Sequence, residues 1–230
     1  GEFLASYMDQ YIETKEKGYI SIPTGNHDTA RISRGRTMEE IELVFACVMT
    51  MPGVPFVYYG DEIGMRFDET VTSVEGGYNR TGSRTPMQWT DGANAGFSTA
   101  DADKLYLPVD GSDGRPTVAD QLKNPDSLLN RVRALINLRH AAPCLWAGGE
   151  FEPLYARSGE YPFVYMRKSG GEQYLIALNP SKETVTVTLP LHDVPAIEIR
   201  MGNGASIEAG KDGYALTMAG VSYGIFKITN

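Results

Sequence analysis

The chain has 230 residues, of which 42% are hydrophobic and 22% charged, and its formal net charge is −8. A hydrophobic fraction near the globular average excludes a mainly disordered chain, and no apolar run approaches the roughly 18 residues that a membrane span needs. The acidic balance argues against a nucleic-acid partner, because phosphate binding requires clustered Lys and Arg.

The N-terminal part alternates helical patterns with short apolar runs. Residues 4–17 place apolar side chains at helical spacing, and the run 19–22 after them predicts a buried strand. A second helix is expected from Thr37, because Thr37 and Glu40 have the spacing of a capping box. A second buried strand follows at 56–59. Continuous apolar runs joined by a helix favour parallel strands covered by helices.

A long polar stretch separates this part from the next helix. Residues 63–123 are rich in Gly, Asp, Thr and Asn and show no long apolar period, which is typical of a functional lid or binding loop. The pair Asn124-Pro125 predicts a helix start, with an N-cap followed by Pro at the first helical position. That helix is expected to end before Pro143.

After Pro143 the apolar spacing becomes twofold. Residues 184–189 and 196–199 alternate, and turns rich in Gly, Asn and Pro separate such runs at short intervals. This pattern is typical of an antiparallel β-sandwich. We therefore expect a domain boundary near residues 142–148, with 1–142 and 143–230 as the two domains.

The two cysteines, Cys47 and Cys144, lie far apart in sequence and lack metal-ligand spacing. They are expected to be reduced, partly buried thiols. No signal peptide is visible, and we favour a cytoplasmic location. The chain lacks a starting Met, however, so its true N-terminus, and with it the compartment, stays open.

Polar side chains follow the first predicted strand directly. Asn26, His27 and Asp28 lie there, with Arg31 just beyond. Functional residues of parallel β/α arrays collect at the carboxyl ends of strands. A His beside a carboxylate, with an Arg within one turn, suits a hydroxyl-rich ligand, because a sugar needs several directional donors and acceptors. From these residues alone, a capped loop with a surface His is the alternative.

Asp61 and Glu62 follow the second predicted strand. Adjacent residues leaving a strand point to opposite faces, so these two cannot form a facing acid/base pair, and we expect structural roles such as binding loop amides or an Arg. The sequence contains no phosphate loop, no Cys/His metal cluster and no Gly-x-Ser-x-Gly elbow. No metal site is therefore predicted in this chain.

Taken in order, these motifs resemble the C-terminal part of an α-amylase superfamily glycoside hydrolase. The resemblance is to the α-glucosidase and oligo-1,6-glucosidase branch, whose loop motif also occurs in trehalose synthases and sucrose isomerases. It covers almost the whole chain. The motifs that carry it lie at residues 25–28, 52–65, 84–89 with 94–98, and 126–129, followed by the β-rich tail.

The resemblance implies the last part of a (β/α)8 barrel, with its seventh and eighth strand units, followed by an antiparallel β-sandwich. It implies that Asp28 is the third active-site carboxylate, which holds two hydroxyls of the glucosyl ring and stabilises the oxocarbenium-like transition state. The resemblance also implies four substrate-binding residues. His27 donates to the same ring, Asn26 and Arg31 complete the site, and Arg84 faces the leaving-group sugar.

One departure from the family pattern matters for activity. Retaining glycoside hydrolysis needs a nucleophile and an acid/base carboxylate about 5 Å apart. In this family they follow the fourth and fifth barrel strands, whereas this chain resembles the family only from just ahead of the seventh. We therefore expect an inactive fragment that the remainder of the barrel completes, from the same parent or from another chain. The family's calcium-bearing inserted domain would also lie outside it, so no cofactor is expected here.

The expected substrate is an α-glucan oligosaccharide or a disaccharide, with no membrane partner. Two alternatives remain. The parent could be a transglycosylase of the trehalose synthase or sucrose isomerase type, in which a sugar rather than water attacks the intermediate. It could also be a non-catalytic, barrel-related interaction subunit, as in amino-acid transporter heavy chains.

Overall fold

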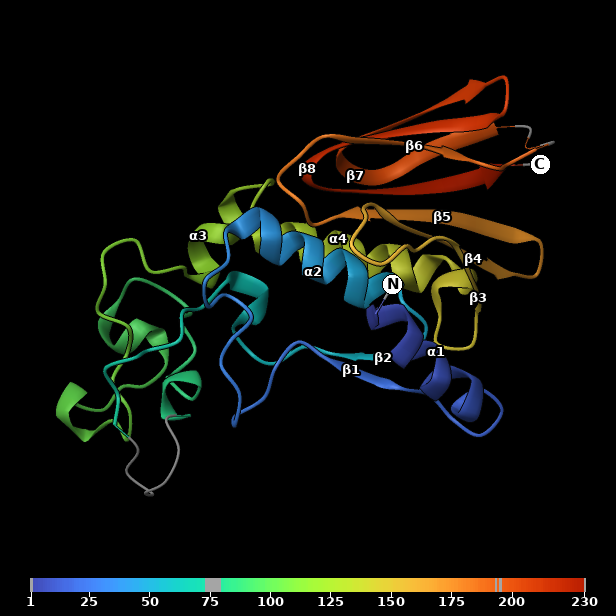
Figure 1. Ribbon diagram of the computed structural model, residues 1–230. Coiled ribbons are helices and arrows are strands. Elements are labelled where there is room, and N and C mark those ends of the chain that lie inside the picture. The colour runs from blue at the N-terminus through green and yellow to red at the C-terminus, as the bar shows by residue number, and fades with distance from the viewer. Residues whose placement is uncertain (1, 73–79, 193, 195, 230) are drawn as a thin grey trace. The chain divides into compact units, whose positions relative to one another are not determined.

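The computed structural model describes residues 2–72, 80–192, 194 and 196–229 (Figure 1). Helices and short strands alternate first, and antiparallel strands follow. In chain order the elements are α1 (Glu2–Thr14), β1 (Ser21–Pro23), α2 (Met38–Thr50), β2 (Val54–Phe56), α3 (Val118–Lys123), α4 (Leu128–Ala141), β3 (Glu150–Tyr155), β4 (Phe163–Ser169), β5 (Glu172–Asn179), β6 (Val185–Leu189), β7 (Ala196–Gly210) and β8 (Gly213–Thr229). None of the described helices is long and apolar enough to cross a membrane.

The predicted capping box opens α2. The Thr37 amide donates to Glu40 Oε2 at 2.8 Å, and the Glu40 amide donates to Thr37 Oγ1 at 3.3 Å. These reciprocal bonds satisfy two of the four amides that a helix start leaves unpaired. The interior of the helix is apolar, with Ile41 and Phe45 fully buried.

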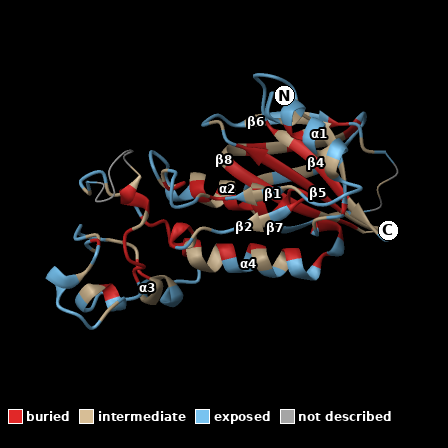
Figure 2. Cartoon of the chain, turned by 90° about the horizontal axis from the view of Figure 1, so that it is seen from below, coloured by how far each residue is buried: buried red, intermediate tan, exposed pale blue. Residues whose placement is uncertain are grey.

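The helix expected from Asn124 begins later, at Leu128. Asn124 instead ends α3, and its side-chain oxygen accepts from the Asp126 amide at 3.0 Å, which forms a turn. Ser127 is the residue that caps α4, because its hydroxyl accepts from the Asn130 amide at 3.3 Å. Buried, intermediate and exposed residues then alternate along α4 (Figure 2).

Strands β1 and β2 form a two-stranded parallel sheet. The Val54 amide donates to Ile20 O at 2.8 Å, and the Thr24 amide donates to Phe56 O at 2.9 Å. Residue numbers rise together along both strands, as in a parallel pair. Each strand lies about two residues from its predicted place, because the hydrogen bonds, not the ends of the apolar runs, define the paired segments. The expected burial of the two strands is wrong, because Ser21, Pro23, Val54 and Phe56 are exposed.

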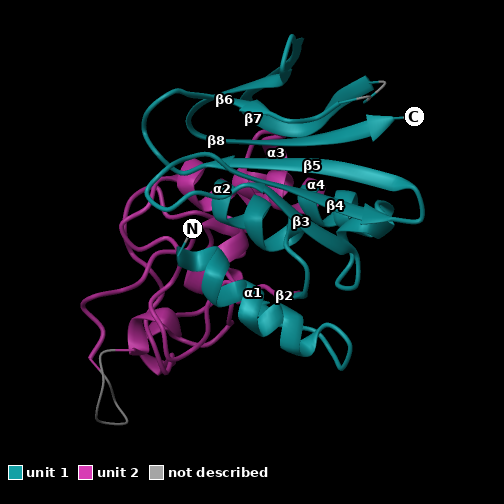
Figure 3. Ribbon diagram, turned by 45° about the vertical axis from the view of Figure 1, so that its right-hand side comes forward, with its two compact units in different colours: residues 1–22, 43–54, 135–230 teal, residues 23–42, 55–134 magenta. Residues whose placement is uncertain are grey.

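The chain divides into two compact units that do not follow chain order (Figure 3). Unit 1 comprises residues 1–22, 43–54 and 135–230, and unit 2 comprises residues 23–42 and 55–134. Unit 1 contains the β-rich part. Unit 2 contains the loop after β1 and the long segment before α4. The predicted binding loop 63–123 therefore lies in unit 2.

The β-rich part of unit 1 is antiparallel throughout, in the order β3-β4-β5-β8-β6, with β7 also paired to β8. The first half of β8 pairs with β6 and its second half pairs with β5, while β7 follows it along both halves. Between the halves Val221 adopts a positive φ of 46°. The buried side chains from β4, β5, β6 and β8 form one apolar cluster. The predicted sandwich is therefore built around a bent β7–β8 pair.

Two buried arginines hold the segment that joins α2 to β2. Arg139 donates to the carbonyl oxygens of Met49, Met51 and Gly53 at 2.7, 3.1 and 2.6 Å. Arg167 donates to Thr50 O. A helix end leaves its last carbonyls unpaired and carries partial negative charge, so buried cations suit it. Burial lowers the pKa of Arg139 to about 10, still well above neutral pH.

Candidate functional site

The loop after β1 presents His27 and Asp28 to solvent. The side-chain oxygen of Asn26 accepts from the Asp28 amide at 2.7 Å, and the Asn26 amide donates to Thr29 Oγ1 at 3.1 Å. These short-range bonds hold a tight turn. The side chains of His27 and Asp28 are 68% and 45% exposed. Asn26 thus shapes the turn that presents its two neighbours.

Asp28 is the centre of a cluster of donors. Its Oδ1 accepts from Arg80 Nη1 at 2.8 Å and from Arg84 Nη2 at 3.0 Å. His27 Nε2 lies 3.4 Å from Asp28 Oδ2, and Arg84 Nε donates to His27 O at 2.9 Å. Charge-assisted bonds of this kind orient a carboxylate well. The carboxylate is therefore fixed in direction while nearly half of its side chain stays accessible.

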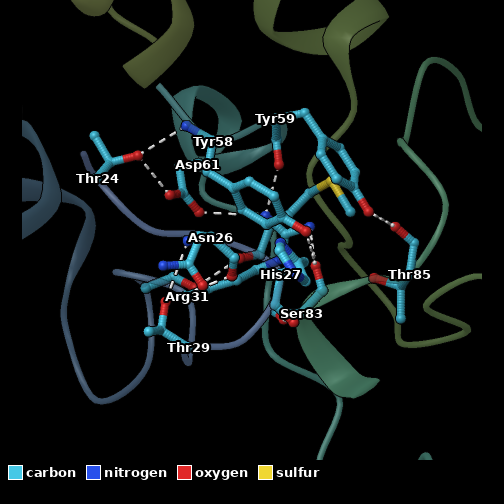
Figure 4. Close-up of polar contacts among 12 residues, drawn as sticks. Thr24, Asn26, His27, Thr29, Arg31, Tyr58, Tyr59, Asp61, Ser83 and Thr85 are labelled. Carbon is cyan, nitrogen blue, oxygen red and sulfur yellow. Dashed lines mark hydrogen bonds and ion pairs between the residues drawn. The ribbon is translucent and has the colours of Figure 1, made fainter. Parts of the chain in front are cut away.

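A second, buried polar cluster joins three segments of unit 2 (Figure 4). Arg31 Nη1 lies 3.2 Å from Asp61 Oδ1, and neither side chain has any exposed surface. Arg31 also donates to Tyr59 O at 2.7 Å and to Ser83 O at 3.0 Å. Thr24 Oγ1 donates to Asp61 Oδ2 at 2.8 Å. This cluster fixes the loop after β1, the loop after β2 and the segment that carries Arg84.

Aromatic side chains complete the surroundings of Arg31. Its guanidinium carbon lies 5.2 Å from the centre of the Tyr58 ring and 5.1 Å from that of the Tyr59 ring, within cation–π range. The Tyr59 hydroxyl donates to Thr85 O at 2.8 Å. These rings stabilise the Arg31 guanidinium, and the Tyr59 hydroxyl connects it to the segment around Thr85.

The structural role expected of Asp61 is confirmed, because it binds Arg31 and Thr24. Burial raises the pKa of Asp61, and the bonds to Thr24 and Arg31 oppose that rise. Arg31 itself has no exposed side-chain surface. Its guanidinium lies where it can orient the loops around Asp28 but not where it can contact a sugar in solvent.

Arg80 and Ser83 were not predicted from the sequence. Residues Thr81–Ser83 form a short 3-10 turn that carries Arg80 and Arg84 on its two sides, and both guanidiniums reach the same carboxylate oxygen. Ser83 contributes its carbonyl oxygen to Arg31. Two arginines four residues apart in a Gly-rich loop are the sequence signal that could have pointed to an anionic partner.

This arrangement can bind a polyhydroxylated ligand. It offers a carboxylate acceptor, an imidazole and two guanidinium donors within one small surface, as vicinal hydroxyls require. Among the residues that the structure describes, no group of three or more His, Cys, Asp and Glu side chains is placed to hold a metal ion.

Comparison with known proteins gives a consistent result. Residues 2–148 match the family model described as the alpha amylase catalytic domain. The chain is similar to a trehalose synthase of a Pimelobacter species, with 34% identity over 83% of the chain and 34% of that protein. It is also similar to the mouse amino acid transporter heavy chain SLC3A1, with 30% identity over 94% of the chain and 32% of that protein. The oligo-1,6-glucosidase of Heyndrickxia coagulans is 30% identical over 77% of the chain and 37% of that protein.

Solved structures agree on the fold. The trehalulose synthase of Pseudomonas mesoacidophila superposes with a TM-score of 0.76 at 24% identity, over 98% of this chain and 47% of that one. The predicted fold, the last part of an α-amylase-type barrel followed by an antiparallel β domain, is thereby confirmed. The chain spans about a third of the length of the curated relatives it matches.

Proposed function

Because this chain belongs to the α-amylase family, we propose that it forms part of the sugar-binding wall of an enzyme that cleaves or transfers α-glucosidic bonds. The observation that carries the proposal is the half-exposed Asp28 carboxylate, oriented by Arg80 and Arg84 beside His27. Its outer oxygen can accept from two hydroxyls of one glucosyl ring. Bonds that shorten as the ring flattens toward the oxocarbenium-like state lower the barrier instead of only binding the substrate.

The bond-breaking carboxylates of the proposed enzyme lie outside these 230 residues. Asp61 is fully buried and paired with Arg31, so it cannot attack a sugar. Glu62 belongs to the same short turn, Asp61–Ile63, and adjacent residues of one strand end cannot face each other as an acid/base pair. The proposal therefore includes an inactive isolated chain and an active longer protein.

The main test is a single substitution in the longer protein. Asp28→Asn is expected to lower kcat/KM for a chromogenic α-glucoside by about 10²-fold or more, because ring-hydroxyl bonds to this group supply several kcal/mol at the transition state. Asp103→Asn is the matched control, since that carboxylate is 72% exposed and pairs only with its neighbour Lys104 among the contacts described. Equal activities of the two variants would contradict the proposed role of Asp28.

Transfer is the second candidate outcome for the same site. One of the similar proteins is a trehalose synthase, at 34% identity. The same residues would hold the glucosyl ring, and a sugar hydroxyl would attack in place of water. Product analysis on maltose and sucrose separates the two: free glucose supports hydrolysis, and a rearranged disaccharide supports transfer.

A non-catalytic role is the third candidate, since another similar protein is an amino acid transporter heavy chain. The intact cluster around Asp28 favours the enzyme, because an interaction surface has no need of an accessible carboxylate fixed by two guanidiniums. A longer protein that carries Asp28 and still fails to turn over any α-glucoside would favour this third candidate.

A further inference from the structure

A small cavity lies in unit 1, where the chain passes from α1 to β1. Its volume is about 190 Å³. Most residues of the segment 14–20 line it, together with Tyr7 and Tyr11 from α1. Pro52 and Glu150, the first residue of β3, are also part of its wall. All of its wall residues belong to unit 1, so the cavity lies within one compact unit.

Packed aromatic rings hold one part of the wall in place. The rings of Tyr7 and Tyr11, one helical turn apart, are nearly parallel, with their centres 6.1 Å apart. Both meet Phe151 edge to face, at 5.9 Å between centres. The Tyr7 hydroxyl donates to Pro52 O at 2.6 Å. These contacts join α1 to the segment before β2, and this part of the cavity is therefore preformed.

Tyr19 adds an exposed ring to the same wall. Its side chain is 63% exposed. The hydroxyl end of the ring lies close to Gly148, another wall residue, where an added Cβ would be 3.5 Å from the Tyr19 hydroxyl oxygen. An aromatic face beside a cavity can stack on the C–H face of a pyranose ring, which is apolar while its rim carries hydroxyls.

Three charged side chains of the wall are available to a ligand. Among the residues that the structure describes, Lys15, Glu16 and Glu150 form no hydrogen bond or ion pair through their side chains. The two carboxylates lie near the Tyr11 hydroxyl. Burial raises the pKa of Tyr11, the buried Arg167 guanidinium opposes that rise, and the Glu150 and Glu16 carboxylates add to it. Acceptors and a donor therefore gather around one small cavity.

The charges around the cavity balance. The carboxylates of Glu16 and Glu150 are matched by the Lys15 ammonium group and the nearby Arg167 guanidinium. An anion would be repelled by the two carboxylates, and a cation by the two positive groups. A neutral polyhydroxyl molecule suits both kinds of group, because each hydroxyl can donate to a carboxylate and accept from an ammonium group. The volume is below the roughly 300–1,000 Å³ of sites for drug-sized ligands, which favours a single sugar ring.

We propose that this cavity is an accessory binding site for one neutral hexose, separate from the Asp28 cluster. The apolar face of the sugar would stack on Tyr19, and its hydroxyls would donate to Glu16 and Glu150. Another hydroxyl would accept from Lys15. Tyr19 precedes β1 in the chain and Asp28 follows it, so the two positions belong to opposite ends of that strand. The inference goes beyond the proposed function and does not depend on the role of Asp28.

Saturation-transfer NMR on the 230-residue chain measures the binding of glucose directly. We expect a saturable signal with a dissociation constant of about 1–10 mM, as the few contacts of one small ring allow. Choline and acetate are the charged probes, and sorbitol is the polyol without a ring. We expect no saturable signal with these three. A missing signal with glucose, or binding of any of the three as tight as that of glucose, would overturn the inference.

Substitutions assign the signal to the cavity. Glu16→Gln and Tyr19→Ala are each expected to weaken glucose binding about fivefold, through a lost acceptor and a lost stacking face. Glu13→Gln and Phe3→Ala are the matched controls, because both residues are exposed on α1 outside the cavity wall. Circular dichroism checks the fold, and Glu150→Gln replaces a cavity variant that does not fold. Unchanged affinity in the cavity variants, or an equal loss in the controls, would contradict the proposal.

A further variant separates this inference from the proposed function. Asp28→Asn alters the Asp28 cluster and leaves the cavity wall intact, so glucose should bind this variant with unchanged affinity. Loss of the signal in Asp28→Asn, with unchanged binding in Tyr19→Ala, would place glucose at the Asp28 cluster. That result would support the proposed function and reject the accessory site.

Discussion

Replacing either member of the buried Arg31–Asp61 pair should destabilise the protein, and the loss should be larger for Arg31. Arg31→Met leaves the Asp61 charge in an interior site without a counterion, which costs about 3–5 kcal/mol in comparable pairs. It also removes the donor from the carbonyls of Tyr59 and Ser83, at about 1–3 kcal/mol each. Allowing for partial overlap of these effects, we expect a loss of at least about 5 kcal/mol.

Asp61→Asn should be milder. The amide has nearly the same shape, and the Arg31 cation loses its counterion but keeps two carbonyl acceptors and two tyrosine rings. We expect a loss of about 3 kcal/mol, because a buried cation is left without its counterion. Since a domain of this size has about 5–15 kcal/mol of stability, the first variant should lose more of its folded population than the second.

Urea unfolding followed by circular dichroism measures both losses, provided that the slope with denaturant is unchanged. The pH dependence adds a second check. In Arg31→Met the pKa of Asp61 should rise further above its unfolded value of about 3.9, so the folded state binds a proton that the unfolded state has released. The deficit relative to wild type should therefore shrink as the pH falls toward 4. An Arg31→Met loss no larger than that of Asp61→Asn, or a deficit that grows in acid, would refute the reasoning.

The remaining predictions concern the helices and the thiols. Arg139→Met removes the donor from three carbonyls at the end of α2 and should cost about 3 kcal/mol in urea unfolding, so a loss below about 1 kcal/mol would contradict the role assigned to Arg139. Thr37→Ala should cost about 1 kcal/mol through the lost cap, and no change in melting temperature would argue against the capping box. Burial raises the pKa of the Cys47 and Cys144 thiols to about 12. At pH 8 both thiols should therefore react with iodoacetamide at least about 100-fold more slowly in native protein than in urea. Equal rates would show that the two thiols are not buried.

Sequence patterns predicted the structure correctly where contacts among a few neighbouring residues determine it. The capping box at Thr37 was predicted and is present, and the parallel pairing of the first two strands followed from their apolar runs. The start of α4 was predicted wrongly, because an Asn side chain can either cap a helix or close a turn. Asn124 closes a turn by accepting from the Asp126 amide, and Ser127 caps the helix by accepting from the Asn130 amide.

Long-range contacts were beyond sequence reasoning. The run at 196–199 suggested a short strand, whereas β7 extends over 15 residues and its partner β8 over 17 residues. The bulges that let them bend depend on partners from both halves of the sandwich. Arg80 and Ser83 likewise gain their roles only because unit 2 folds their loop against Asp28 and Arg31.

The position of β8 governs how unit 1 can assemble. It is the last described strand in chain order, yet it lies between β5 and β6 and is also the strand with which β7 pairs. On the ribosome, strands β3 to β5 can form a meander. Strands β6 and β7 lack the strand with which they pair until residues 213–229 leave the exit tunnel. Assembly of this domain should therefore wait for residues 213–229, and ribosome-stalled chains lacking β8 should expose β5 and the apolar faces of β6 and β7 to chaperones.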